Sequence, residues 1–153
     1  MTTKVPGTYD DADLILKLYD LRREERLRAA RKWFAALPPF TSREQFLADC
    51  PPGTEENASF RMVTSYWDMA SAFVVNGILN AELFYRSNSG ELLYVWERVR
   101  RIVPALREAN KNPLSYRNLE EVAKGFIEFY GKNAPGYYEN LVATMEKQIP
   151  ASK

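Results

Sequence analysis

The spacing of apolar side chains constrains this chain more than any other feature of its sequence. Apolar residues return at intervals of three and four positions, as on one face of a helix, and rarely at the interval of two that marks a half-buried strand. Capping residues, prolines and glycines stand in the gaps between these runs. The pattern predicts an all-α protein.

The segment 55–86 is the most informative of the predicted helices. Two apolar stripes about 100° apart run along it, which indicates that two of its faces are buried. The third side is polar at its ends and apolar in the middle. We therefore expect this helix to lie at the centre of the fold, with the other helices packed around it. The stripes contain Phe60, Val63, Trp67, Ala70, Val74, Gly77, Ala81 and Phe84, and Met62, Tyr66, Met69, Phe73, Asn76, Asn80 and Leu83.

A long helix is predicted over 9–37, with Thr8 as its N-cap and Pro38 and Pro39 as its stop. Its apolar face moves by about 130° around the axis between the two halves. The helix therefore either bends or packs its halves against different partners.

Four further helices are predicted, near 41–50, 91–106, 115–130 and 135–149. The first of them begins at Thr41 or Ser42, with Glu44 completing a Thr-x-x-Glu capping box. Pro104 falls inside the second and predicts a kink or a restart there. Pro135 suits the first position of the last helix.

The length of 153 residues is that of one ordinary domain, and no repeat, low-complexity stretch or long linker divides it. We expect a single domain over 1–153, built as a bundle of five or six helices around a central buried helix.

The chain contains no histidine, which excludes Ser-His-Asp and Cys-His catalysis and the imidazole ligands of the usual zinc sites. Cys50 is the single cysteine, and we expect a buried, inert thiol. Neither of the common glycine-rich phosphate loops is present. No catalytic residue, metal or cofactor is therefore predicted, and the inventory favours a non-enzymatic protein.

The sequence also bears on location. Residues 1–13 lack the basic start and apolar run of a signal peptide. The most apolar stretch, 69–84, contains Asn76, Asn80 and Glu82 and is shorter than the roughly 20 apolar residues that cross a bilayer. A single cysteine is what a reducing compartment leaves. We expect a cytoplasmic protein without a transmembrane segment.

A basic cluster occupies 22–32, where six basic residues accompany two acidic ones in a chain whose net charge is +1. The simplest interpretation is a solvated face in which Glu24 pairs with Arg28. A surface for a protein partner is the second, and a nucleic-acid surface the third, because no aromatic residue interleaves the arginines to stack bases. The predicted interaction surface comprises Arg22, Arg26, Arg28, Arg31, Trp33 and Phe34, with Tyr137 or Tyr138 as further exposed aromatic residues. In a second arginine group, the side-chain stems are expected to cover apolar surface while the guanidinium groups reach water. This group comprises Arg98, Arg100, Arg101 and Arg107.

Two asparagines, Asn76 and Asn80, lie one turn apart on an otherwise apolar stripe. An unpaired buried amide costs about 1 to 3 kcal/mol, so buried asparagines need partners, for which Tyr66, Trp96 and Arg107 are candidates. They belong either to a satisfied core network or to a helix end that opens to solvent. The alternative is the polar floor of a pocket for a small apolar ligand, lined by Tyr66, Asn76, Asn80, Trp96 and Arg107.

The run 76–83, followed by Trp96, Pro104 and Arg107, resembles an uncharacterised bacterial family of helical domains of unknown function. The resemblance covers about Asn57 to Tyr130. It implies a helical fold and brings no assigned activity. Members of that family often carry an N-terminal membrane helix, for which this sequence has no counterpart.

These observations favour a non-enzymatic helical protein that acts through protein association, in the simplest case with itself. The shifted apolar face of the segment 9–37 is the reason, because one compact domain would not cover both of its halves. A bundle that binds a small molecule or lipid is the alternative, and a nucleic-acid-binding module is third.

Overall fold

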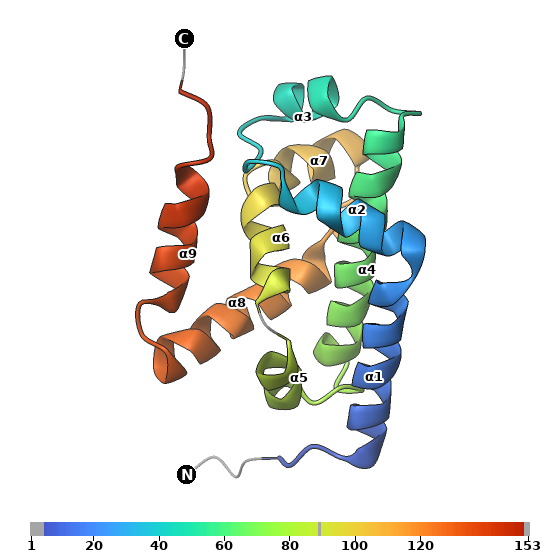
Figure 1. Cartoon of the computed structure of the whole chain (residues 1–153), viewed down its shortest axis with the longest axis vertical. Coiled ribbons are helices and arrows are strands. Elements are labelled where there is room, and N and C mark those ends of the chain that lie inside the picture. The colour runs from blue at the N-terminus through green and yellow to red at the C-terminus, as the bar shows by residue number, and fades with distance from the viewer. Residues whose placement is uncertain (1–4, 89, 152–153) are drawn as a thin grey trace.

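The computed structural model describes residues 5–88 and 90–151, and within them it contains nine α-helices and no strand (Figure 1). The prediction of an all-α protein is confirmed. The helices are shorter and more numerous than the predicted five or six, because three of the predicted segments are each interrupted and form two helices.

The predicted helix 9–37 is two helices, α1 (Tyr9–Arg23) and α2 (Glu25–Ala35). Thr8 is the N-cap of α1, as predicted, in a capping box with Asp11. Glu24 has extended backbone between the two helices, and its Oε2 accepts a hydrogen bond from the Leu27 N–H at 3.0 Å. The break explains the shift of the apolar face. The predicted Glu24–Arg28 pair is wrong, because the Glu24 carboxylate caps α2 instead.

Helix α3 (Arg43–Asp49) begins behind Ser42, whose Oγ accepts a hydrogen bond from the Gln45 N–H. The predicted Thr41–Glu44 capping box is wrong, because Thr41 donates its N–H to the side chain of Gln45 rather than of Glu44. Cys50 follows α3 and is completely buried. Burial raises the pKa of its thiol to about 11, so the thiol stays protonated at neutral pH.

The predicted helix 55–86 is also wrong in its length, since it divides into α4 (Glu55–Val75) and α5 (Ala81–Ser87). Gly77 adopts φ +72°, a left-handed conformation that ends α4. The N–H groups of Ile78 and Leu79 then close on the carbonyl of Phe73. The apolar periodicity continues through this turn, so the pattern alone does not reveal it.

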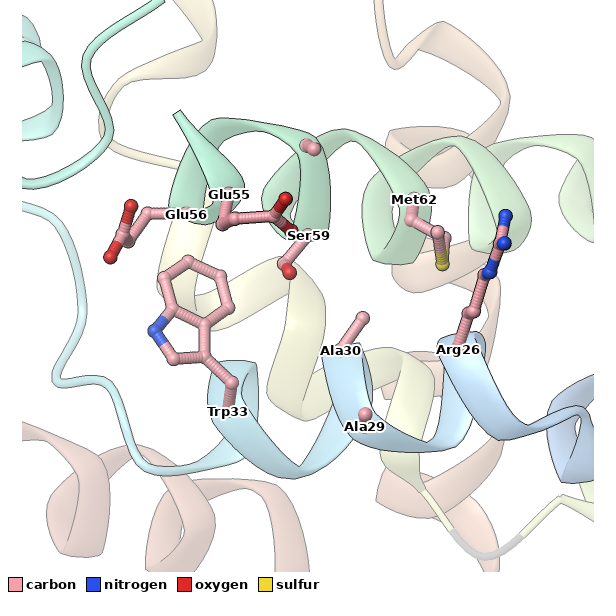
Figure 2. Close-up of a pocket in the computed structure, with 9 residues that line it drawn as sticks. Arg26, Ala29, Ala30, Trp33, Glu55, Glu56, Ser59 and Met62 are labelled. Carbon is pink, nitrogen blue, oxygen red and sulfur yellow. The ribbon is translucent and has the colours of Figure 1, made fainter. Parts of the chain in front are cut away.

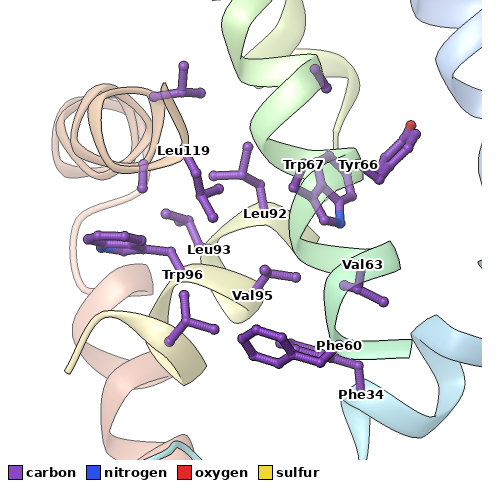
Figure 3. Close-up of a cluster of buried hydrophobic side chains, with 14 of the residues drawn as sticks. Phe34, Phe60, Val63, Tyr66, Trp67, Leu92, Leu93, Val95, Trp96 and Leu119 are labelled. Carbon is purple, nitrogen blue, oxygen red and sulfur yellow. The ribbon is translucent and has the colours of Figure 1, made fainter. Parts of the chain in front are cut away.

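Helix α4 is nevertheless the centre of the packing. It contacts α8 and α2 most extensively and also touches α6. Its C-terminal part is less enclosed than predicted, because Met69 and Val75 are 39% and 36% exposed. The buried side chains gather in one hydrophobic cluster, of which Figure 3 shows Phe34, Phe60, Val63, Tyr66, Trp67, Leu92, Leu93, Val95, Trp96 and Leu119.

Helices α6 (Glu91–Val99) and α7 (Val103–Asn110) replace the predicted segment 91–106. Pro104 lies in the first turn of α7, so the predicted restart is confirmed. The first-turn N–H groups of a helix have no intrahelical acceptor, and a proline is therefore tolerated there. The prediction that the Arg98 guanidinium reaches water is wrong. This side chain is buried, and its guanidinium donates hydrogen bonds to main-chain carbonyls.

Helices α8 (Arg117–Asn133) and α9 (Tyr137–Glu146) complete the chain. The N-terminus of α8 is capped by another helix, since Oδ1 of Asp68 in α4 accepts the Leu119 N–H at 2.9 Å. Helix α9 begins behind Gly136 rather than at Pro135 and lies along one edge of the molecule, beside α8 and α6 (Figure 1).

Candidate functional site

A cleft of about 640 Å³ lies between α2 and α4. The two helices pass each other in opposite directions, so that Arg26 lies beside Met62 and Trp33 lies beside Glu55 and Glu56 (Figure 2). The cleft is lined by Arg26, Ala29, Ala30, Trp33, Glu55, Glu56, Ala58, Ser59 and Met62. We call it the α2–α4 groove.

The middle of the α2–α4 groove is built from small and apolar side chains. Ala30 is buried, whereas Ala29 is exposed and Ser59 is half-buried. The half-buried Trp33 forms a wall, with its ring edge-on to Phe34 at a centroid distance of 6.4 Å. Small residues in the middle leave room for an incoming side chain or helix.

The two ends of the groove carry opposite charges. Glu55 and Glu56 stand in the first turn of α4, where the helix dipole favours carboxylates. Arg26 stands in the first turn of α2, where the dipole disfavours a cation. None of the three forms an ion pair or side-chain hydrogen bond among the described residues. Arg26 attracts the Glu24 carboxylate two residues before it, and its guanidinium, like the two glutamates, remains without an ion-pair partner in this part of the chain.

The groove contains part of the predicted interaction surface, namely Arg26 and Trp33. Arg22, Arg28 and Arg31 instead line clefts on the side of α2 that faces α6. Phe34 is 2% exposed and lies on the core face of α2, one turn after Ala30. Its assignment to an exposed surface is wrong.

The two other predicted surface aromatics also have intramolecular partners. Tyr137 stacks on Tyr130 of α8 at a centroid distance of 4.2 Å. Tyr138 donates its hydroxyl to the buried carboxylate of Glu97. Burial, together with this contact, raises the pKa of the Tyr138 phenol. Both side chains therefore fasten α9 to the body of the protein.

The residues of the predicted ligand pocket are held in separate parts of the fold. The Tyr66 hydroxyl donates to the main-chain oxygen of Leu18 in α1 at 2.7 Å, and burial raises the phenol pKa to about 12. Trp96 is buried in the core cluster. Arg107 donates to Glu120 of α8 at 2.7 Å and to the main-chain oxygen of Ser115 at 2.9 Å.

The two asparagines belong to the turn between α4 and α5. Asn76 is exposed and donates its side chain to the main-chain oxygen of Ala72. Asn80 caps α5 by accepting the Leu83 N–H, and its own N–H is bound by Asp11 at 2.8 Å. Both asparagines therefore pair with groups near this turn and at the N-terminal end of α1 rather than with the expected partners Tyr66, Trp96 and Arg107.

The sequence did not indicate two parts of these surfaces. One is the acidic end of the groove, and the other is the contribution of α6 to the clefts on the opposite side of α2. Glu55 and Glu56 meet Trp33 through helix packing, which no local motif encodes (Figure 2). Glu91 and Tyr94 of α6 line a cleft with Arg28 and Arg31. One sequence signal for this cleft exists. Residues 28, 31, 32 and 35 recur at helical spacing, which places them on one face of a helix.

Within residues 5–88 and 90–151, no cluster of three or more cysteine, aspartate or glutamate side chains is arranged to hold a metal ion. In the same part of the chain, no helix combines the length and apolar character needed to cross a bilayer.

Comparison with known proteins adds the family. Neither the curated proteins nor the solved structures give a significant match. A family model described as a domain of unknown function, DUF4760, matches residues 8–126. The match contains most of the segment on which the resemblance to a helical family of unknown function rests, and extends it through α1 to α3. The chain belongs to the DUF4760 family of domains of unknown function.

Proposed function

We propose that the protein is non-enzymatic and works as a homodimer that forms through the α2–α4 groove. The observation that carries this proposal is the placement of opposite charges at the two ends of the groove, around a middle of small side chains. We retain the cytoplasm as its proposed location, since a single cysteine is typical of a reducing compartment.

A groove of this kind is complementary to itself. In a dimer with twofold symmetry, the same patch of both copies forms the contact. An axis through the middle of the groove, near Ala29 and Ser59, brings Arg26 of one copy to Glu55 and Glu56 of the other. Two equivalent sets of ion pairs would then form, one at each end.

The apolar part of the groove supports the same arrangement. Trp33 is half-buried in the single chain and would lose its remaining exposure against a second copy. Tryptophan and arginine are enriched among the residues that dominate binding energies at interfaces. Small residues such as Ala29 and Ser59 allow two helices to approach closely.

Charge reversal provides a sharp test. Arg26→Glu places a glutamate opposite the acidic pair of the second copy, and Glu55→Lys with Glu56→Lys places lysines opposite Arg26. Each variant alone should dissociate to monomer, because like charges across an interface cost several kcal/mol. An equimolar mixture should form heterodimer, since both ends then pair opposite charges. Native mass spectrometry distinguishes the heterodimer by its mass.

The matched control is Arg28→Glu, which makes the same charge change two residues away, in a cleft on the other side of α2. It should leave the dimer intact. The proposal fails if the mixed variants stay monomeric or if Arg28→Glu dissociates the dimer as strongly as Arg26→Glu. A variant that merely misfolds would not be rescued by mixing.

A further inference from the structure

The face of α2 opposite the groove carries a second feature, two clefts separated by an ion pair. Arg31 of α2 binds Glu91 of α6 through two hydrogen bonds of 2.7 Å. A cleft of about 600 Å³ lies on one side of this pair and a cleft of about 300 Å³ on the other. We call them the large and the small basic cleft.

The small basic cleft has more cations than its surroundings neutralise. Arg22, Arg23 and Arg31 line it, and Glu91 is the carboxylate among its lining residues. The net charge of its lining is therefore about +2. A phosphate monoester carries about −1.5 to −2 at neutral pH, which matches this surplus.

Hydrogen-bond donors in the small basic cleft also outnumber acceptors. The Glu91 carboxylate is occupied by Arg31, and the Asn88 side-chain oxygen accepts from Arg22 at 2.8 Å. Trp67 lines the cleft and is 1% exposed, and its buried indole N–H has no acceptor among the described residues. A donor-rich site of this kind fits a ligand that offers several oxygen acceptors.

The large basic cleft also contains more cations than carboxylates. Arg28 and Lys32 line it and form no ion pair within the described residues. Arg98 also lines it and is 4% exposed, and its guanidinium binds main-chain carbonyls rather than a carboxylate. Burial lowers its pKa, because its charge lies in a poorly solvated place. An anion in the cleft would be attracted by this charge.

An aromatic ring lines each of the two clefts. Tyr19 of α1 lies in the small cleft, with the Arg22 and Arg23 guanidinium groups each 5.6 Å from its ring centroid. Tyr94 of α6 lines the large cleft and is 37% exposed. The basic cluster therefore has an aromatic neighbour in each cleft, Tyr19 from just before it in the sequence and Tyr94 from a distant helix.

We propose that the two basic clefts bind one small-molecule polyphosphate, with phosphate groups on both sides of the Arg31–Glu91 pair. A compact ligand fits better than a nucleic-acid strand, because the cations converge in two clefts rather than along an extended track. The site is independent of the proposed dimer, since none of its residues lines the α2–α4 groove.

The test is calorimetric titration with orthophosphate, pyrophosphate and tripolyphosphate. Affinity should rise along this series as the second cleft becomes occupied. The variant Arg23→Gln with Lys32→Gln removes one exposed cation from each cleft. It should weaken tripolyphosphate binding by about tenfold or more, as expected for the loss of charge-assisted contacts.

The matched control is Lys17→Gln with Lys111→Gln, which also removes two exposed cations, both outside the two clefts and outside the α2–α4 groove. It should change the affinity less than about twofold. Saturable binding that the cleft variant weakens and the control retains supports the site. No binding at millimolar tripolyphosphate overturns it, as does an equal loss in the two variants, which would indicate bulk charge alone.

A single-stranded oligonucleotide of about 20 nucleotides distinguishes the other source of phosphate groups. It should bind no more tightly than tripolyphosphate at equal ionic strength. If the oligonucleotide binds more tightly, and its affinity grows with strand length, the occupant is a nucleic acid and the proposal is wrong.

Discussion

Nε of Arg98 in α6 donates a hydrogen bond of 2.8 Å to the main-chain oxygen of Leu37, two residues beyond the end of α2. Its other nitrogens donate to the main-chain oxygens of Ala35 and Tyr94. The last carbonyls of a helix have no partner in the helix itself. The Arg98 side chain supplies donors to the end of α2 and thereby holds α2 on α6, next to both proposed sites.

Replacing Arg98 should destabilise the protein strongly. Arg98→Ala removes the side-chain donors from the Ala35 and Leu37 carbonyls and empties a buried site, and should lower the free energy of unfolding by about 2 to 4 kcal/mol. Arg98→Lys should cost less, because one ammonium reaches some of the three acceptors. Urea denaturation measures both. The control is Arg101→Ala, which removes an exposed ion pair with Glu146 and should cost less than about 1 kcal/mol. Equal losses at both positions would contradict this role of Arg98.

The Tyr66 hydroxyl ties α4 to α1 through its bond to Leu18. Tyr66→Phe removes this buried hydrogen bond and should cost about 1 kcal/mol in thermal or urea unfolding. Tyr94→Phe is the matched control, since Tyr94 is partly exposed and its hydroxyl has no hydrogen bond within the described residues. A cost at Tyr94 as large as that at Tyr66 would argue against this bond.

Asp11 connects the start of α1 to the start of α5. Its carboxylate accepts from the Asn80 N–H and from the Thr8 N–H and hydroxyl, and these bonds hold its pKa below the ordinary value. A carboxyl with a lowered folded-state pKa stabilises the protein above its unfolded pKa of about 3.9. This stability is lost as the pH falls through the lower, folded value.

The Asp11→Asn variant tests that linkage. It should be less stable than the unmodified protein at neutral pH, and the difference should shrink below about pH 4. Asp10→Asn is the control, because Asp10 makes none of these bonds. Urea unfolding across the acid range follows both variants. A stability difference for Asp11→Asn that is unchanged between neutral and acidic pH would refute the assignment.

Two glycines should respond to alanine in opposite directions. Gly77→Ala puts a side chain at φ +72° and should cost about 1 kcal/mol. Gly131 lies inside α8, and a Cβ there would meet no atom within 4 Å. Gly131→Ala should therefore stabilise the protein by up to about 1 kcal/mol. Thermal unfolding measures both, and changes of the same sign would be inconsistent with the turn after α4.

Features that depend on residues close together in the sequence were predictable. The helical periodicity, the N-cap Thr8 and the restart at Pro104 each depend on residues within about one turn of the chain. The turn at 76–80 was not predictable, because its apolar residues keep the helical spacing on both sides of Gly77.

Contacts between distant residues account for the other differences. Asp68 caps α8 across 51 positions of the sequence, and Arg98 reaches back 61 positions to Leu37. For the candidate site, the sequence indicated Arg26 and Trp33 from local charge and aromatic content. Glu55 and Glu56 joined them only once α2 and α4 were packed together (Figure 2).

The mass of the unmodified chain in solution tests the proposed association most directly. Sedimentation equilibrium from about 1 μM to about 1 mM covers the range of transient and stable dimers. The proposal predicts a weight-average mass that rises from the 17.7 kDa of one chain, levels off at twice that value, and rises less at high salt. A mass that stays at 17.7 kDa up to the highest concentration would contradict it.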